Sequence, residues 1–250
     1  MTKQALPART ARLGRPLGPT HQVEAVLLVL PGGVPESVRR PSPLAAVGAH
    51  ALARHAVRTA ARAGASLTAH VVHPRYRGWN GDAAHLAADA AWALDEVAHR
   101  YGDAPVCLAG SGTGARAALR AAGYRTVVSV VALATWAPDG DDEPVDHLAD
   151  RQVLFVHGTD DEVCAPDTSY RLAERARKAT PAVCRFEVHT DRHALRRYRA
   201  EVTALCAEFT VGTLCDQELP RPLRDALAAP PPLGLRMPLA SGFGTTAHAH

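Results

Sequence analysis

Short apolar runs alternate with helical patterns along the middle of the chain. Six runs have the near-continuous apolar character of strands buried on both faces, at 23–30, 66–72, 105–109, 126–133, 152–157 and 184–189. Most segments between them have helical spacing. In 82–100 a candidate N-cap at Asp82 precedes apolar positions one helical turn apart, at Leu86, Ala90, Ala93, Leu94 and Val97. This alternation predicts an α/β fold, a doubly wound and mostly parallel sheet of about six strands with helices on both faces.

The two ends of the chain lack this alternation. Residues 1–20 mix Pro, Gly, Arg and Thr without apolar periodicity, and residues 213–250 contain "LPRPL", "APPPLGL" and "SGFGTTAHAH". Such composition is typical of poorly ordered segments. We therefore expect one domain over 21–212, with a disordered basic tail before it and a disordered Pro/Gly-rich tail after it.

Charge and cysteine content narrow the possible partners. The net charge of the whole chain is +3, whereas the first 20 residues alone have a charge of +4. The rest of the chain therefore has a net charge close to −1, which predicts no nucleic-acid partner. The five cysteines show no C-x-x-C spacing, which predicts a reducing cytoplasm and neither a disulfide framework nor a metal site. We expect no cofactor. The oligomeric state stays open.

Hydropathy and residue usage add two further expectations. No apolar run approaches the roughly 20 residues of a membrane span, so no membrane partner is expected. Arg outnumbers Lys 26 to 2 and Ile is absent, a bias that suggests a bacterium of high GC content.

Ligands of parallel α/β sheets bind at the carboxyl ends of the strands, and the loop after 105–109 carries the first candidate chemistry. The sequence "GSGTG" (110–114) leads from this strand into a helix. A nucleophile elbow needs small residues two before and two after the nucleophile, because strand and helix backbones approach closely there. Gly110 and Gly114 are those small residues, and this frame places Gly112 where the nucleophile belongs.

Two candidates remain for a nucleophile in this loop. Sliding the frame by one residue makes Ser111 the nucleophile, but it puts the β-branched Thr113 at a position that requires a very small residue. In the unshifted frame Gly112 relaxes the strained backbone and deletes the chemistry. A water in the space of the missing side chain is then the second candidate.

Two further loops supply an acid and a base at the same edge of the sheet. Asp161 follows the strand 152–157 and His193 follows the strand 184–189, in the chain order elbow, acid, histidine of one triad arrangement. The loop after the first strand contains Gly32 and Gly33, either of which could present a backbone N–H to an oxyanion. The Thr113 N–H is the other expected oxyanion donor.

Aromatic residues in two loops are candidates for the substrate pocket. Tyr76 and Trp79 follow the second strand, and Trp136 follows the strand 126–133. Gly32 is expected beside them. For Tyr76 and Trp79 an ordinary loop that turns through Asn80 into the next helix is an equally good interpretation.

Residues 22–212 resemble the α/β-hydrolase superfamily, in particular the small lidless serine hydrolases of the dienelactone-hydrolase and carboxylesterase kind. The resemblance rests on four motifs, namely "LPGG", "LAGSGTGARAAL" against G-x-S-x-G-[GA]-R-A-A-L, "VLFVHGTDDEV" against H-G-x-x-D-x-V, and "DRHAL" against G-x-G-H. It implies that Asp161 is the triad acid, favoured over Asp160 by the motif spacing, and that His193 is the base. The family's serine falls on Gly112.

This departure leaves three functions open. The first is hydrolysis of a small ester or related acyl bond, with His193 as base, Asp161 as its orienter, and Ser111 or a water as nucleophile. The second is a pseudoenzyme that binds a small-molecule acyl ligand without turning it over. The third is chemistry that needs the His–Asp pair but no serine, such as proton abstraction beside a carbonyl. Likeness of fold supports all three equally.

Overall fold

The computed structural model describes residues 8–138 and 143–244, and it has an α/β fold around one eight-stranded sheet in the order β1-β3-β2-β4-β5-β6-β7-β8. The six central strands run parallel, as β2 (Ala25–Leu30), β3 (Leu67–His73), β4 (Val106–Ser111), β5 (Val127–Leu133), β6 (Gln152–Gly158) and β7 (Val183–Val188). Two-residue strands complete the edges, with β1 (Arg12–Leu13) antiparallel to β3 and β8 (Met237–Pro238) parallel to β7. The predicted fold class is confirmed.

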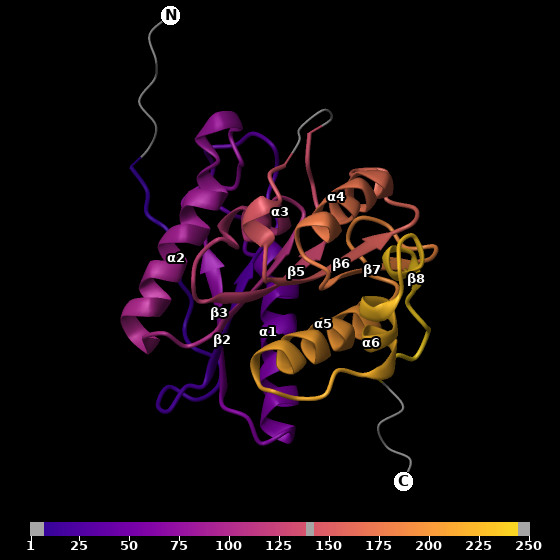
Figure 1. The fold of residues 1–250 in the computed structure, drawn as a ribbon. Coiled ribbons are helices and arrows are strands. Elements are labelled where there is room, and N and C mark those ends of the chain that lie inside the picture. The colour runs from indigo at the N-terminus through magenta and orange to yellow at the C-terminus, as the bar shows by residue number, and fades with distance from the viewer. Residues whose placement is uncertain (1–7, 139–142, 245–250) are drawn as a thin grey trace, which may run out of the picture.

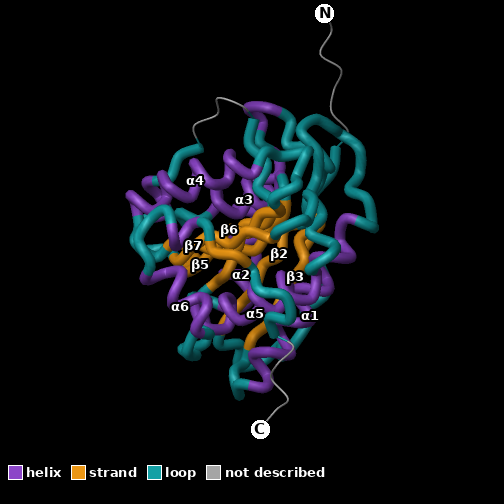
Figure 2. Tube along the Cα trace, turned by 90° about the vertical axis from the view of Figure 1, so that its right-hand side faces the viewer, coloured by secondary structure: helices purple, strands orange, loops and turns teal. Residues whose placement is uncertain are grey.

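Helices cover both faces of the sheet (Figures 1 and 2). Their bounds are α1 (Ala45–Arg62), α2 (His85–Tyr101), α3 (Thr113–Ala121), α4 (Pro166–Ala179), α5 (Arg199–Leu214) and α6 (Arg221–Ala228). The core on one face is shared by α1, α5 and α6, and the core on the other by α2, α3 and α4. None of the helices in the described ranges combines the length and apolar character needed to cross a bilayer.

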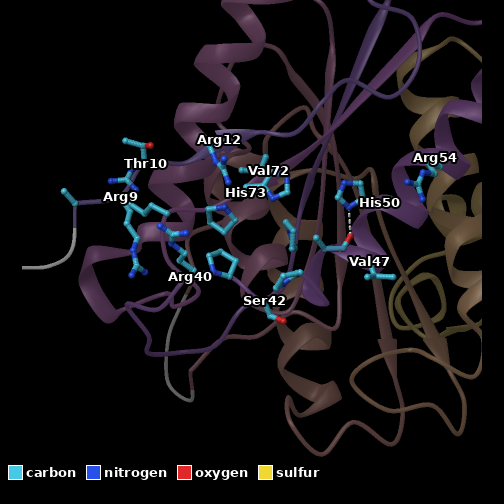
Figure 3. Close-up of a pocket in the computed structure, with 17 residues that line it drawn as sticks. Arg9, Thr10, Arg12, Arg40, Ser42, Val47, His50, Arg54, Val72 and His73 are labelled. Atoms are coloured by element: carbon cyan, nitrogen blue, oxygen red, sulfur yellow. Dashed lines mark hydrogen bonds between the residues drawn. The ribbon is translucent and has the colours of Figure 1, made fainter.

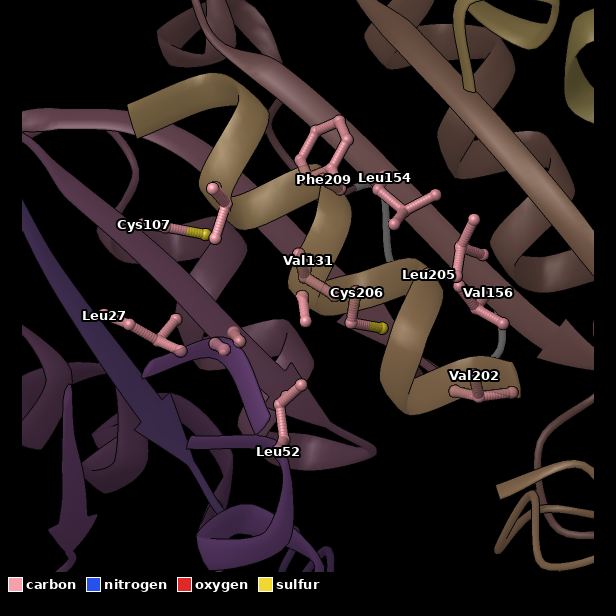
Figure 4. Close-up of a cluster of buried hydrophobic side chains, with 14 of the residues drawn as sticks. Leu27, Leu52, Cys107, Val131, Leu154, Val156, Val202, Leu205, Cys206 and Phe209 are labelled. Atoms are coloured by element: carbon pink, nitrogen blue, oxygen red, sulfur yellow. The ribbon is translucent and has the colours of Figure 1, made fainter. Parts of the chain in front are cut away.

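The continuous apolar runs of the strands supply both cores at once. Because successive side chains of a strand point to opposite faces, Leu27 packs in the core under α1 and α5, whereas Leu28 packs in the core under α2 and α3. In Figure 4, Leu205 and Phe209 of α5 lie beside Leu154 of β6. Each such fully buried side chain contributes about 1.5–3 kcal/mol to folding.

The ends of the chain are more ordered than the sequence predicts. The segment before β2 follows the sheet edge, where the Gly14 N–H donates to Val71 O (2.8 Å) and the Leu17 N–H to Ala69 O (2.9 Å). Near the other end, α6 buries Leu223, and the buried Arg185 donates to Leu235 O (3.0 Å). Pairing with distant strands orders these segments, and such pairing leaves no local periodicity. Residues 1–7 and 245–250 of the expected tails lie outside the described residues.

The helix predicted from Asp82 begins later than expected. A single 3₁₀ turn occupies Gly81–Ala83, and α2 starts at His85. Asn80 and Ala84 on either side of this turn have positive φ angles of 65° and 41°. The left-handed backbone at these two positions keeps Asp82 from capping α2.

Candidate active site

The loops after β2, β4, β6 and β7 meet at one edge of the sheet because these strands are parallel. Gly112 lies in the β4–α3 turn with φ 54° and ψ −120°. A Cβ built on Gly112 would lie 3.5 Å from His193 Nε2 and 3.7 Å from His193 Cε1, with nothing closer. The turn therefore has room for a side chain at position 112, directed at His193, and has none.

The glycines on either side of this turn are fixed by packing. A Cβ on Gly110 would lie 2.3 Å from Gly114 O, and a Cβ on Gly114 would lie 2.4 Å from Leu30 O. No real Cβ makes such approaches to backbone atoms. Strand β4, helix α3 and strand β2 consequently touch along a line that only glycine permits, as the elbow pattern requires.

We expect Gly110→Ala to destabilise the protein by about 3 kcal/mol, because the added methyl overlaps backbone that cannot move independently. Gly48→Ala in α1 is the matched control: a Cβ there meets nothing within 4 Å, and alanine is the better helix former by about 1 kcal/mol. Urea unfolding of both variants measures the difference. Equal stabilities would contradict the close approach at Gly110.

The structure joins the predicted acid and base. His193 Nδ1 lies 2.8 Å from Asp161 Oδ2. With Nδ1–H donating to the carboxylate, Nε2 carries the lone pair and faces the empty side-chain position of Gly112. About a third of the His193 side chain is exposed (34%), while the Asp161 side chain is fully buried. Asp160, the alternative acid, is exposed.

Asp161 is held by three more donors besides His193. The Val163 and Cys164 N–H groups donate to Oδ1 at 2.8 and 2.9 Å, and His157 Nε2 lies 3.1 Å from Oδ2. Burial alone would raise the pKa of this carboxyl, but the hydrogen bonds from His157, Cys164, His193 and Val163 hold the pKa well below its usual range. Asp161 is therefore a carboxylate throughout the neutral range. His157 is a partner of Asp161 that was not singled out from the sequence, and its i, i+4 spacing from Asp161 is the signal that could have identified it.

Cys164 is a fourth titratable group here, beside Asp161, His193 and His157. Its Sγ, an Asp161 oxygen and a His193 nitrogen all lie within 4.8 Å of one another, the arrangement among the described residues that could hold a metal ion. A metal bound there would have to replace the hydrogen bond between Asp161 and His193. Burial, and then the charge of Asp161, raise the pKa of Cys164 to about 12. The sulfur is thus a thiol, which is a poor nucleophile.

Asp191 fixes the loop that carries His193. Its carboxylate accepts the Arg192 N–H through Oδ1 (2.9 Å) and the Arg197 and Tyr198 N–H groups through Oδ2 (3.0 and 3.1 Å). Gly158 lets this loop approach β6, since a Cβ there would lie 2.4 Å from Asp191 O. Asp191 could not be identified from the sequence, because three backbone donors from one folded loop leave no spacing pattern.

One of the two expected oxyanion donors is already engaged. The Gly33 N–H donates to the Thr113 side-chain hydroxyl at 2.8 Å, and Thr113 is buried. The threonine side chain therefore occupies the place where an oxyanion would accept from Gly33.

Ser111, the shifted nucleophile candidate, faces the loop after β2. Its Oγ lies 3.1 Å from the position that a Cβ on Gly32 would take. Among the described residues Ser111 makes no side-chain hydrogen bond to His193. The structure thus brings Ser111 and Gly32 together, and Gly112, Asp161 and His193 together.

The aromatic residues expected in the pocket are packed instead. Tyr76 and Trp79 are buried, and Trp79 belongs to the core under α2 and α3. The Arg116 guanidinium lies 4.2 Å from the Trp79 ring centre and 5.2 Å from the half-buried Trp136 ring. Arg116 also pairs with the buried Glu143. The two tryptophans therefore hold a buried cation, a role that competes with lining a substrate pocket.

No protein-family model and no curated protein sequence matches this chain. Solved structures do match its fold. A putative α/β hydrolase of unknown function from Agrobacterium tumefaciens is 16% identical with a TM-score of 0.59, over 84% of this chain and 94% of that one. Est1E from Butyrivibrio proteoclasticus, in complex with ferulic acid, is 13% identical with a TM-score of 0.58, over 82% and 96%. An α/β serine hydrolase homologue from Coxiella burnetii is 16% identical with a TM-score of 0.53, over 83% and 99%. Together with the sheet order and the loops described above, these likenesses show that the chain has the α/β-hydrolase fold.

Proposed function

We propose that this protein is a pseudoenzyme of the α/β-hydrolase fold, which binds a small acyl compound beside His193 and forms no acyl-enzyme. The observation that carries the proposal is the empty side-chain position at Gly112, 3.5 Å from His193 Nε2. Serine-type acyl transfer needs an oxygen there, and loss of the nucleophile costs a triad about 10⁶-fold in kcat.

Three neighbouring groups support the absence of acyl transfer. The Thr113 hydroxyl occupies the Gly33 N–H, which removes one oxyanion donor. Cys164 is held as a thiol by burial and by Asp161. Ser111 Oγ lies 3.1 Å from the position that a Cβ on Gly32 would take, and among the described residues it makes no hydrogen bond to His193.

The class of ligand follows from the chemistry of the site. His193 Nε2 is a lone-pair acceptor at the edge of the sheet and can take a hydrogen bond from a ligand hydroxyl. Est1E, which shares the fold, holds ferulic acid. Methyl ferulate, a neutral ester with a phenol hydroxyl, is accordingly a suitable first ligand to test.

A second function is favoured by the intact hydrogen bond between His193 and Asp161. In this alternative His193 takes a proton from a water that occupies the space beside Gly112, and the water attacks the ester directly. The oriented Nε2 lone pair is the specific observation in its favour. The reaction would form no covalent intermediate with the protein.

Three measurements on one preparation separate these functions. For the wild type we expect no fluorophosphonate labelling, no p-nitrophenyl acetate hydrolysis above buffer, and a shift of the His193 ring resonances on titration with methyl ferulate. Ser111→Ala should behave like the wild type. Hydrolysis without labelling, lost in His193→Ala, would establish the water mechanism instead. Labelling that Ser111→Ala abolishes would establish Ser111 as the nucleophile and overturn the proposal.

A further inference from the structure

A cavity of about 1040 Å³ lies at the β3 edge of the sheet, away from the elbow. It is lined by residues of the segment 8–12, the loop 40–43, the first turns of α1 and the end of β3 (Figure 3). Neither Gly112, Asp161 nor His193 lines it, although Pro31, the residue before Gly32, does. The cavity is therefore separate from the candidate active site and beside one of its loops.

The side chains around this cavity are strongly basic. Seven cationic or titratable bases line it, namely Arg9, Arg12, Arg40, Arg54, Arg75, His50 and His73, and the described lining residues include no aspartate or glutamate. Within residues 8–138 and 143–244, Arg75 alone of this set has an acidic partner, the buried Asp89 at 2.5 Å. Within the described part of the chain the other four arginines form no ion pair. Four guanidinium groups, which stay charged at any ordinary pH, thus surround one hollow without a counter-charge.

Tertiary pairing holds two of these arginines in place. Strand β1 sets Arg12 opposite His73 of β3, and Arg9 donates to Val38 O at 2.6 Å. Burial, and then the charges of Arg12 and His50, lower the pKa of His73. The folded chain therefore maintains a positive potential in this cavity.

The remaining walls offer a different chemistry. Helix α1 lines the cavity along one side, through Ala46, His50 and Arg54, and has no acidic residue in its first turn that could offset the arginines. Apolar side chains cover much of the rest, at Pro31, Pro41, Pro43, Val47, Val72 and Pro74. The volume is at the upper end of the roughly 300–1000 Å³ of small-molecule sites and is far larger than an inorganic ion needs.

We infer that this cavity binds an organic phosphate, with its phosphoryl group among Arg9, Arg12 and Arg40 and its apolar part on the proline and valine wall. A phosphate monoester carries close to two negative charges and three acceptor oxygens, which suits several guanidinium forks at once. A monocarboxylate would neutralise only one of the four unpaired arginines. The inference holds whether or not the elbow is catalytic.

The concave shape favours a small molecule over a nucleic acid. Arg9 and Arg12 lie toward one end of the hollow and Arg54 at the other, with His73 and His50 between them (Figure 3), so the charges border one concave volume. A nucleic-acid surface would instead carry them along an extended face that follows the phosphate backbone.

Phenyl phosphate is the first ligand to test, by calorimetric titration and by the rise in melting temperature at low ionic strength. We expect it to bind more tightly than inorganic phosphate, which lacks the apolar part, and more tightly than benzoate, which has one charge. Arg12→Ala and Arg40→Ala should each weaken binding about 10-fold, the effect of one charge-assisted hydrogen bond. Both arginines are exposed, so these variants should fold normally.

Arg58→Ala is the matched control. Arg58 is exposed on α1 one turn beyond Arg54 and does not line the cavity, so its loss should leave the affinity unchanged. The inference is overturned if phenyl phosphate fails to bind up to about 10 mM, or if the Arg12→Ala/Arg40→Ala double variant binds as the wild type does. Benzoate binding as tightly as phenyl phosphate would contradict the phosphate class. Much tighter, Arg12-dependent binding of a short single-stranded oligonucleotide would replace it with nucleic acid.

Discussion

Gly112→Ser should be labelled stoichiometrically by a fluorophosphonate at residue 112, whereas we expect no labelling of the wild type. A Cβ at this position lies 3.5 Å from His193 Nε2, so one staggered position of the new Oγ falls within hydrogen-bond reach of that nitrogen. Asp161 already orients the imidazole. We expect p-nitrophenyl acetate hydrolysis to rise by about 10²- to 10³-fold, less than the roughly 10⁶-fold that the nucleophile contributes in an optimised triad.

Gly112→Ala is the control for this variant. It places the same Cβ on a backbone with φ 54°, at a similar cost of about 1–3 kcal/mol in stability, but supplies no hydroxyl. It should be neither labelled nor active. If folded Gly112→Ser is also silent, His193 and Asp161 do not form a working acid–base pair, and the site is structural.

The Gly33 N–H, an expected oxyanion donor, is bonded to Thr113, which is why we expect only a limited gain in hydrolysis from Gly112→Ser. A second substitution can free this N–H. Thr113→Val keeps the side-chain shape and removes the hydroxyl that occupies the Gly33 N–H. In the Gly112→Ser background we expect it to raise kcat by about 10-fold, a part of the roughly 10²- to 10³-fold that one such donor supplies in a mature site. An unchanged kcat would mean that Gly33 is not aimed at the reacting carbonyl.

Asp161→Ala should destabilise the protein by about 3 kcal/mol at pH 7. The substitution leaves three donors without this acceptor, namely His193 Nδ1 and the Val163 and Cys164 N–H groups. His157 Nε2 keeps a second acceptor, Cys164 O, at 3.1 Å. Asp160→Ala is the matched control, because Asp160 directly precedes Asp161 and is exposed. This substitution should change the free energy of unfolding by less than about 0.5 kcal/mol. Equal effects in urea unfolding would contradict the hydrogen-bonded role of Asp161.

The same carboxylate gives the stability a defined pH dependence. The pKa of Asp161 is lowered by folding, so its contribution is complete above the unfolded pKa of about 3.9 and is lost as the pH falls below that value. We expect the wild type to lose stability between about pH 5 and pH 2 more steeply than Asp161→Asn. If the free energies of unfolding of the wild type and Asp161→Asn change with pH in the same way, the charge of the Asp161 carboxylate does not stabilise the fold.

The sequence could predict the strands and the order of the catalytic-type loops, for identifiable reasons. A parallel strand buried on both faces must be apolar at nearly every position, and the six runs that meet this condition became β2 to β7. Parallel strands place their following loops at one edge, which is why Gly112, Asp161 and His193 could be assigned to a common site before any distance was known. Gly110 and Gly114 revealed the turn because close backbone contact admits no side chain.

Contacts between segments far apart in the chain were decided by the tertiary structure alone. The local sequence around Arg12 and around Leu223 is typical of disordered tails. Pairing with β3 orders the first segment, and packing of α6 near β7 orders the second. The engagement of the Gly33 N–H by the Thr113 hydroxyl joins residues 80 positions apart. The basic cavity likewise gathers arginines from the N-terminal segment, a loop and α1, none of which stands out in a sequence so rich in arginine. The sequence by itself determined the six central strands and the glycine-framed turn that carries Gly112, since both depend on local residue type and spacing. The hydrogen bond between Gly33 and Thr113 and the basic cavity depend on which distant surfaces meet, and only the folded chain decides that.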